Sequence, residues 1–263
     1  MRKNLESARR WLSFSLRRRL RGLQNSMNRS HFATAKSTQN LPHLIKEHRL
    51  PIYRRLSGVD PELFENKRRN LELAIAKLDG LLVSPGKVFS LWRLVGPPTS
   101  ARGYLEGLVL DRGRPSRGVG GGLCQLANAL LWLALHAELR VVERHHHSLD
   151  IFPDDHRRVP FGTGASIVYN FKDLRFKNDS RCRYQFRLHL TDEDLVARIF
   201  SASPPERHYF ISESDHAFIS EADGLYRRNT ILREVRDAAG NRLHTETLFK
   251  NFAKCQYTLQ EAQ

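Results

Sequence analysis

Apolar residues recur every three or four positions in three segments of the chain, and this spacing predicts three helices. The first covers residues 1–24 and is amphipathic, since arginines fill the face opposite its apolar stripe. The second starts at Asp60-Pro61, an N-cap acceptor followed by a proline at the first helical position, and it ends at Gly80. The third covers 124–139 and is apolar on nearly every side, which predicts a central, buried helix. The stripe of the first helix comprises Leu5, Ala8, Leu12, Leu16, Leu20 and Leu23.

Alternation of apolar and polar residues, typical of half-buried strands, dominates the second half of the chain. Residues 184–190 (YQFRLHL) alternate, and LVARIFS returns after the turn TDED. TILREVR and RLHTETL, joined by DAAGN, predict a second hairpin. The stretch AKCQYTL places Cys255 on an apolar face, so this thiol is predicted to pack in the core.

Residues 96–122, between the second and third helices, hold eight glycines and are interpreted as an irregular loop. Residues 139–147, after the third helix, predict a strand. Because helices come first and strands later, the predicted class is α+β. It combines a helical N-terminal part, a central buried helix after the glycine-rich loop, and a mainly antiparallel sheet.

The net charge of +15 is concentrated at the N-terminus. Residues 1–49 hold twelve Lys and Arg against two Asp and Glu, a net charge of +10, and the remaining residues contribute only +5. With the polar stretch 28–40 interpreted as a linker, this predicts a basic arm over 1–40 and a domain over 41–263. The basic amphipathic helix at 1–24 suits an anionic membrane surface. Nucleic acid is not the expected partner, because no nucleic-acid-binding motif accompanies the charge.

Several features of the sequence bound the setting in which the protein works. The sequence contains no run of about eighteen apolar residues, so no membrane-spanning helix is predicted. The basic start of the chain lacks the apolar stretch and the cleavage site of a signal peptide. We therefore expect a cytoplasmic protein that can associate with the inner face of the membrane. The three cysteines, an odd number in a long chain, are expected to be reduced thiols. P-loop, Gly-x-Ser-x-Gly and dinucleotide-binding motifs are absent from the sequence, so no cofactor is expected.

The stretch 118–148, GVGGGLCQLANALLWLALHAELRVVERHHHS, carries the candidate chemistry. Glycines before a helix permit sharp turns and leave backbone N–H groups open, so the amides from Gly120 to Leu123 could donate to an oxyanion. Cys124 stands at the helix start, where the positive end of the helix dipole favours thiolate over thiol. The stretch therefore predicts a site with a reactive thiol at Cys124.

Three consecutive histidines supply candidate bases, since a thiolate nucleophile needs an imidazole to carry protons. On a strand, His145 and His147 point the same way and His146 the opposite way, so only one or two can face Cys124. Cys124 with His145 and His147 also offers suitable metal ligands, but CxxC and HExxH spacings are absent and no metal is expected. The structural alternative is a tight turn into a buried helix, with a cysteine small enough to fit and histidines on the surface.

Long blocks of the sequence resemble those of the VanW family. NKRRNLELAIAKLDG, SPGKVFSLWRLVGPPT, GYLEG, GVGGGLCQLANALLW, VVERHHHSLDIFPDDHRRVPFGTGASIVYN and DLRFKN occur in the family's order. The resemblance runs from His43 to Tyr257 and leaves out the arm. The family's motif positions fall on Gly120, Gly121, Gly122, Cys124 and Gln125, and on Arg144, His147 and Ser148.

The chain departs from the family pattern at one acidic position. Many family members carry Gly-x-Asp-Ala where this chain has GTGA at 162–165, so the aspartate is absent. A cysteine–histidine–aspartate triad built on that position loses its orienting acid. Asp150, Asp154 and Asp173 are the candidate substitutes.

The resemblance implies an accessory protein linked to glycopeptide (vancomycin) resistance or to peptidoglycan metabolism in the cell envelope, and it leaves the reaction open. One hypothesis is a thiol-dependent hydrolase or acyl transferase that acts on peptidoglycan peptides. In it Cys124 is the nucleophile and His147 or His145 is the base. The groups that would stabilise the oxyanion are Gln125 and the loop amides, including those of Gly121 and Gly122.

The alternative hypothesis is a module that binds a cell-wall peptide or its precursor without chemistry. Asn128, Glu143 and Arg144 then line a polar pocket together with the histidines, and Cys124 merely packs. The missing family aspartate favours this second hypothesis.

Overall fold

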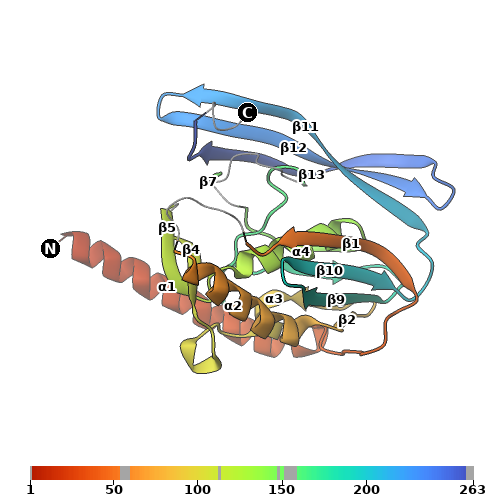
Figure 1. Ribbon diagram of the computed structural model, residues 1–263, viewed down its shortest axis with the longest axis horizontal. Helices are drawn as coiled ribbons and strands as arrows, with labels where there is room; N and C mark the ends of the chain where they lie inside the picture. The colour runs from red at the N-terminus through yellow and green to blue at the C-terminus, as the bar shows by residue number, and fades with distance from the viewer. Residues whose placement is uncertain (1, 54–59, 112–113, 147–148, 151–158, 259–263) are drawn as a thin grey trace.

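The computed structural model places one buried helix, α4, between a four-stranded sheet and a smaller three-stranded sheet (Figure 1). The structure describes residues 2–53, 60–111, 114–146, 149–150 and 159–258, and the side chains within these ranges except those of 2–14, 29, 110–111 and 114–115. The helices are α1 (Arg2–Met27), α2 (Glu62–Leu78), α3 (Leu91–Val95) and α4 (Leu123–Leu135), with short 3-10 turns at Arg29–His31 and Ser100–Arg102.

Helix α4 forms the centre of the core. Ten of its residues are buried, and the helix contacts strands β1, β6 and β10 and helix α2. Each fully buried leucine in such a setting contributes about 1.5–3 kcal/mol relative to an exposed one. The prediction of a central buried helix after the glycine-rich loop is confirmed.

Two sheets flank α4. The first has the antiparallel order β1-β10-β9-β2, and the second has the order β3-β8-β6. The predicted hairpin at 184–201 is confirmed as strands β9 and β10. The strands of these sheets are β1 (His43–Pro51), β2 (Leu82–Val83), β3 (Val88–Ser90), β6 (Leu139–Glu143), β8 (Arg175–Asn178), β9 (Tyr184–Leu190) and β10 (Asp194–Ser201).

A third sheet of long strands, in the order β11-β12-β13-β7, lies across the body of the molecule (Figure 1). The predicted second hairpin is confirmed as β12 and β13, and Cys255 at the end of β13 is buried as predicted. With these mainly antiparallel sheets the α+β class is confirmed. The strands are β7 (Leu149–Asp150), β11 (Arg207–Glu221), β12 (Gly224–Asp237) and β13 (Arg242–Cys255).

Three local predictions were wrong. Strand β1 precedes α2, so strands are not confined to the second half. The glycine-rich stretch 96–122 contains a hairpin of β4 (Glu106–Asp111) and β5 (Arg114–Val119), in which Gly107 pairs with Gly118. Strand β6 ends at Glu143, so His145 and His146 follow the strand and the alternation argument does not apply to them, while His147 lies outside the described residues.

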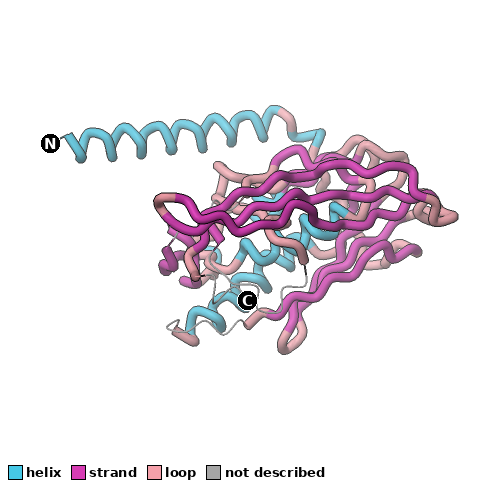
Figure 2. Tube along the Cα trace, turned by 90° about the horizontal axis from the view of Figure 1, so that it is seen from above, coloured by secondary structure: helices cyan, strands magenta, loops and turns pink. Residues whose placement is uncertain are grey.

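The stretch 28–40, interpreted as a linker, runs along the domain with ordered hydrogen bonds. The amide of Ala33 donates to Val88 O at 2.9 Å, and the amide of Ser37 donates to Gly80 O at 2.9 Å. Helix α1 precedes this stretch, and its N-terminal end projects beyond the other elements (Figure 2). The side chains of Leu5, Ala8 and Leu12 lie outside the described set, and the division of the chain at residue 40 stays a prediction.

The glycine loop before α4 is shaped by two requirements. Gly120 and Gly122 have φ values of +81° and +91°, which glycine adopts without strain. Gly121 lies directly against the backbone of Gly107 in β4, where an added Cβ atom would overlap the Gly107 carbonyl. The start of α4 and the β4–β5 hairpin are therefore in backbone-to-backbone contact.

This contact predicts that Gly121→Ala lowers the free energy of unfolding by about 2–3 kcal/mol, because the added methyl group must push the hairpin away. Chemical denaturation would measure the change. Gly240→Ala is the control: its φ of +89° carries a backbone cost of about 1 kcal/mol, and no atom lies near its added Cβ. Equal effects of the two substitutions would show that the close approach does not matter.

Candidate functional site

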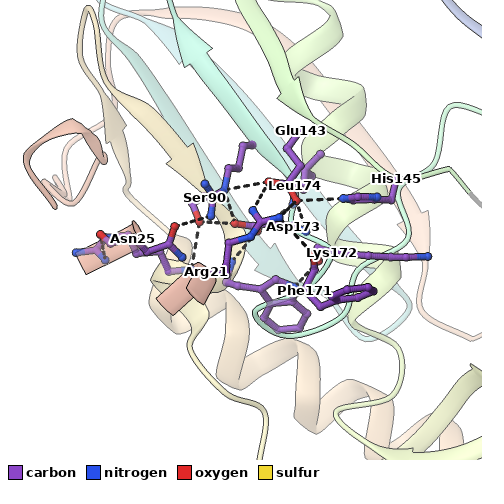
Figure 3. A network of polar contacts seen from close by, with 12 residues as sticks. Arg21, Asn25, Ser90, Glu143, His145, Phe171, Lys172, Asp173 and Leu174 are labelled. Atoms are coloured by element: carbon purple, nitrogen blue, oxygen red, sulfur yellow. Dashed lines mark hydrogen bonds and ion pairs between the residues drawn. The ribbon is translucent and has the colours of Figure 1, made fainter. Parts of the chain in front are cut away.

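The carboxylate of Glu143, at the end of β6, is the centre of a polar network (Figure 3). Arg21 binds it with both terminal nitrogens, Nη1 to Oε2 at 2.5 Å and Nη2 to Oε1 at 2.9 Å. The amide of Asp173 donates to Oε1 at 3.0 Å, and Nε2 of His145 lies 3.1 Å from the same oxygen. Nε of Arg175 lies 3.4 Å from Oε2. Four groups from three separate parts of the chain thus converge on one carboxylate.

The surroundings of Glu143 keep it ionised. Its side chain is only 16% exposed, and burial alone would favour the neutral acid. The hydrogen bonds from Arg21, the Asp173 amide and His145 outweigh burial and hold the pKa of Glu143 below its usual value. The same pairing raises the pKa of Arg21. The site therefore holds a stable carboxylate–guanidinium pair at neutral pH.

Helix α1 is attached to the domain through this network. Besides the Arg21 pair, Nη2 of Arg175 donates to Oδ1 of Asn25 at 2.8 Å. Nη1 of Arg93 donates to the Asn25 carbonyl at 3.2 Å, and Nδ2 of Asn170 donates to the Arg18 carbonyl at 2.5 Å. The arm predicted from its charge is in this structure a docked helix.

Asp173 is a second, more deeply buried acid in the network. Its oxygens accept hydrogen bonds from Ser90 Oγ at 2.6 Å, from the amides of Trp92 and Leu174, and from Nε of Arg175 at 2.8 Å. These bonds fix the start of α3. Asp173 is thus engaged in holding the scaffold, and its carboxylate forms no hydrogen bond with a histidine among the residues that the structure describes.

Of the other two candidate acids, Asp150 and Asp154, the structure describes only Asp150. Asp150 is buried and accepts a hydrogen bond from the Tyr257 hydroxyl at 2.7 Å, with Nη1 of Arg227 at 3.4 Å. It belongs to the third sheet, where its partners are a tyrosine and an arginine. Asp154 lies outside the described residues.

Cys124 stands in the first turn of α4, as predicted, and its side chain is half-buried. The expectation of a thiolate was wrong, because burial raises the pKa of the Cys124 thiol, and the hydrogen bond with the Ile167 backbone offsets this only in part. Among residues whose placement is described, no histidine forms a hydrogen bond with the thiol. His147 falls outside those residues.

His145 and His146 follow β6 and differ in surroundings. The His145 ring is 36% exposed and faces Glu143, and its carbonyl accepts the Ser166 amide at 2.7 Å. His146 is exposed. Burial of its ring and the positive charges of Arg144 and Lys172 lower the pKa of His146. His146 therefore lies among positive charges, whereas His145 faces a carboxylate.

Arg144 and Asn128, two of the polar residues predicted to line a pocket, hold the segment 161–168 in place. Nε of Arg144 donates to the Gly164 carbonyl at 2.9 Å, and Nη2 donates to the Gly162 carbonyl. The Arg144 guanidinium also lies 3.8 Å from the centre of the Phe249 ring, and burial lowers its pKa to about 10. Oδ1 of Asn128 accepts the Ala165 amide at 2.8 Å.

The loop amides proposed as oxyanion donors are engaged within the fold. Those of Gly120 and Gly121 donate to Leu105 O and Gly118 O at 2.9 and 3.0 Å, and that of Gly122 donates to Leu108 O at 3.2 Å. The Gln125 side chain donates to the Pro51 carbonyl at 2.7 Å. Its Oε1 is buried and has no hydrogen-bond partner within the described part of the chain. The glycine loop thus shapes the start of α4 through its own hydrogen bonds.

In the described residues, no three His, Cys, Asp or Glu side chains gather so as to hold a metal ion. None of the helices in the described ranges is both long and apolar enough to cross a membrane.

Sequence reasoning missed the residues that build the network around Glu143. Arg21 was one of many arginines in the first helix, and no local pattern separates it from its neighbours. Asp173 was considered only as a substitute acid, and Lys172 and Arg175 were not considered. Only their proximity in the folded chain links these residues, because they are far apart in sequence and meet at one carboxylate.

The fold is α+β, with a central buried helix that begins with a Gly-Gly-Gly-x-Cys loop. An Arg-His-His turn after β6 contacts the GTGA segment. These features are the ones that the sequence shares with the VanW motifs. The chain belongs to the VanW family: the family model described as VanW like protein matches residues 66–200. Over 232 residues, 88% of this chain and 84% of the relative, it is 32% identical to the Vancomycin B-type resistance protein VanW of Enterococcus faecalis (strain ATCC 700802 / V583).

A shorter similarity links the chain to a second relative. It is 31% identical over 114 residues, 43% of this chain and 36% of the relative, to the uncharacterized protein YoaR of Bacillus subtilis (strain 168). No solved structure matches the chain. The family resemblance seen in the sequence motifs is confirmed by these matches.

The Glu143 network predicts that Glu143→Gln lowers the free energy of unfolding by roughly 2–3 kcal/mol, because the amide cannot accept both hydrogen bonds of the Arg21 guanidinium. Chemical denaturation measures the loss, and hydrogen exchange of the α1 amides reports whether the helix is released. Glu138→Gln is the matched control. Its pair with Arg207 is exposed, so a change below about 0.5 kcal/mol is expected. A Glu143→Gln effect no larger than that of the control would contradict the role of the network.

The environment of Cys124 predicts slow alkylation. Because burial raises its pKa, the native thiol should react with iodoacetamide near neutral pH roughly tenfold or more slowly than in the unfolded chain. Peptide mapping after timed quenching measures the rate at each cysteine. A native rate equal to or above that in denaturant would show an activated thiolate and contradict this account.

Proposed function

We propose that this protein is an accessory protein in glycopeptide resistance and that it recognises a cell-wall peptide or its precursor without thiol chemistry. The link to resistance rests on similarity to the Vancomycin B-type resistance protein VanW. The choice of binding over catalysis rests on Cys124. Its thiol is kept protonated by burial and has the backbone of Ile167 as its partner.

The polar groups left for a ligand lie around the turn after β6. His145 is partly exposed, His146 is exposed, and Lys172 is half-buried close enough to His146 to influence its pKa. Figure 3 shows the Lys172 side chain extending away from α1, while the His145 ring points back toward Glu143. We name His145, His146 and Lys172 the cationic rim.

The charge of the cationic rim indicates what it would bind. The negative charge of Glu143 is already matched by Arg21 and Arg175, so the surroundings of His146 are positive overall. Wall peptides end in a carboxylate, and their lipid-linked precursors carry phosphates as well. Lys172 can meet either anionic group through a charge-assisted hydrogen bond, and the exposed ring of His146 can add a further hydrogen bond. The proposed ligand is therefore the anionic end of a peptidoglycan peptide or precursor, met at the cytoplasmic face of the membrane.

A thiol-dependent hydrolase or acyl transferase is the competing function. It is favoured by the position of Cys124 in the first turn of α4. It requires a base, and His147, the family's motif histidine, would have to serve. The two functions make opposite predictions for Cys124, which allows them to be separated.

Calorimetric titration of the full chain with a muropeptide that ends in a free carboxylate tests the binding proposal. Lys172→Ala should weaken binding by about tenfold or more, since it removes a charged contact, and His146→Ala should weaken it by about threefold or more, since it removes a hydrogen bond. Lys77→Ala, an exposed lysine on the last turn of α2, is the matched control and should leave the affinity unchanged. Cys124→Ala should also bind as the unaltered protein does.

Two results would overturn the binding proposal. One is a muropeptide whose affinity does not respond to Lys172→Ala or His146→Ala. The other is turnover of the muropeptide, detected by mass spectrometry, that Cys124→Ser abolishes while the protein stays folded. Resistance in cells that survives Cys124→Ser would instead exclude the thiol enzyme.

A further inference from the structure

One face of the docked helix α1 is apolar and exposed to solvent. Leu16, Leu20, Leu23 and Met27 are 58%, 49%, 62% and 85% exposed. Their spacing of four, three and four residues places them in one stripe along the helix. An isolated exposed leucine needs no explanation, but four aligned ones on an ordered helix form a surface that favours a partner.

The opposite face of α1 is held by the domain, so the helix cannot turn its stripe inward. Arg21 pairs with Glu143, Asn25 contacts Arg93 and Arg175, and the Arg18 carbonyl accepts from Asn170. These three residues follow at intervals of three and four positions, which defines a second stripe about half a turn from the first. The leucines therefore face away from the molecule.

Arginines border the apolar stripe on both sides. Arg17 and Arg19 are both exposed, and at 100° per residue they fall on either flank of the line through Leu16 and Leu20. Arginine side chains can extend their guanidinium groups toward phosphates while their methylene groups lie along apolar surface. The net charge of +10 over residues 1–49 adds a long-range attraction to an anionic surface.

We propose that α1 lies on the surface of an anionic lipid bilayer through the stripe of Leu16, Leu20, Leu23 and Met27, with Arg17 and Arg19 at the headgroups. A second copy of the chain fits this face less well, because two such stripes would bring four arginines of the same charge together. Nucleic acid would be contacted by the arginines and leave the leucines in water. The proposal does not depend on what the cationic rim binds.

The docking of α1 gives this proposal a geometric consequence. The helix is about 10 Å thick and its rear face is bonded to Glu143, so the network would lie about one helix diameter behind the headgroups. The domain would then meet the bilayer in one fixed orientation. A peripheral helix on a flexible tether would impose no such orientation.

Co-sedimentation of the full chain with vesicles tests the proposal. Vesicles of phosphatidylcholine mixed with phosphatidylglycerol should bind the protein, and vesicles of phosphatidylcholine alone should bind it much more weakly. Leu23→Asp should weaken binding to the mixed vesicles by about tenfold or more, because it removes a buried leucine and adds a negative charge. Gln24→Asp, the adjacent exposed residue, makes the same change in charge off the stripe and should cost no more than about fivefold.

Leu23 and Gln24 are both exposed, so both variants should fold, and matching circular dichroism spectra would establish this. Equal losses for the two variants would overturn the proposal, because binding would then depend on charge alone. Two further results would overturn it, each in a protein that does not bind the mixed vesicles. One is a dimer that Leu23→Asp dissociates. The other is binding to duplex DNA that Leu23→Asp does not change.

Discussion

The partly buried carboxylate of Glu143 is the interaction on which the arrangement of the surrounding elements depends. A charge with so little access to water must be matched by donors, and here they come from α1, from the turn before β8 and from the chain after β6. Arg21 supplies the strongest of these contacts. The helix that carries it is therefore part of the charge balance of the domain, although its sequence has the composition of a detachable basic arm.

The family motifs on α4 and after β6 act mainly on the chain itself. Arg144 and Asn128 bind the segment 161–168 from two sides, and the glycine-loop amides bind neighbouring carbonyls. Their polar atoms are thereby engaged in hydrogen bonds within the fold. A motif rich in polar residues can thus define an architecture through contacts within the chain.

The sequence predicted those elements whose signal is local. The alternation over 184–190 indicates a strand with one buried face, and the apolar run of α4 indicates a helix that is buried on all sides. Strand β1 was not predicted, because it is an edge strand with an irregular register and its exposure does not alternate. The pairing of Arg21 with Glu143 joins residues separated by 122 positions, and no spacing within either segment indicates it. The candidate site was predicted as a list of residue types, and only the fold revealed which of them contact one another.

The forked contact between Arg21 and Glu143 also fixes the rotation of α1. A guanidinium binds both oxygens of a carboxylate in one plane only, and successive residues of a helix point about 100° apart. Gly22 already lies close to Asn170, which leaves little room for a side chain in its place. One residue inserted between Leu16 and Arg21 would therefore swing every earlier turn of α1 by more than a quarter of a circle, and lengthening or shortening this helix would change which of its sides the molecule presents outward.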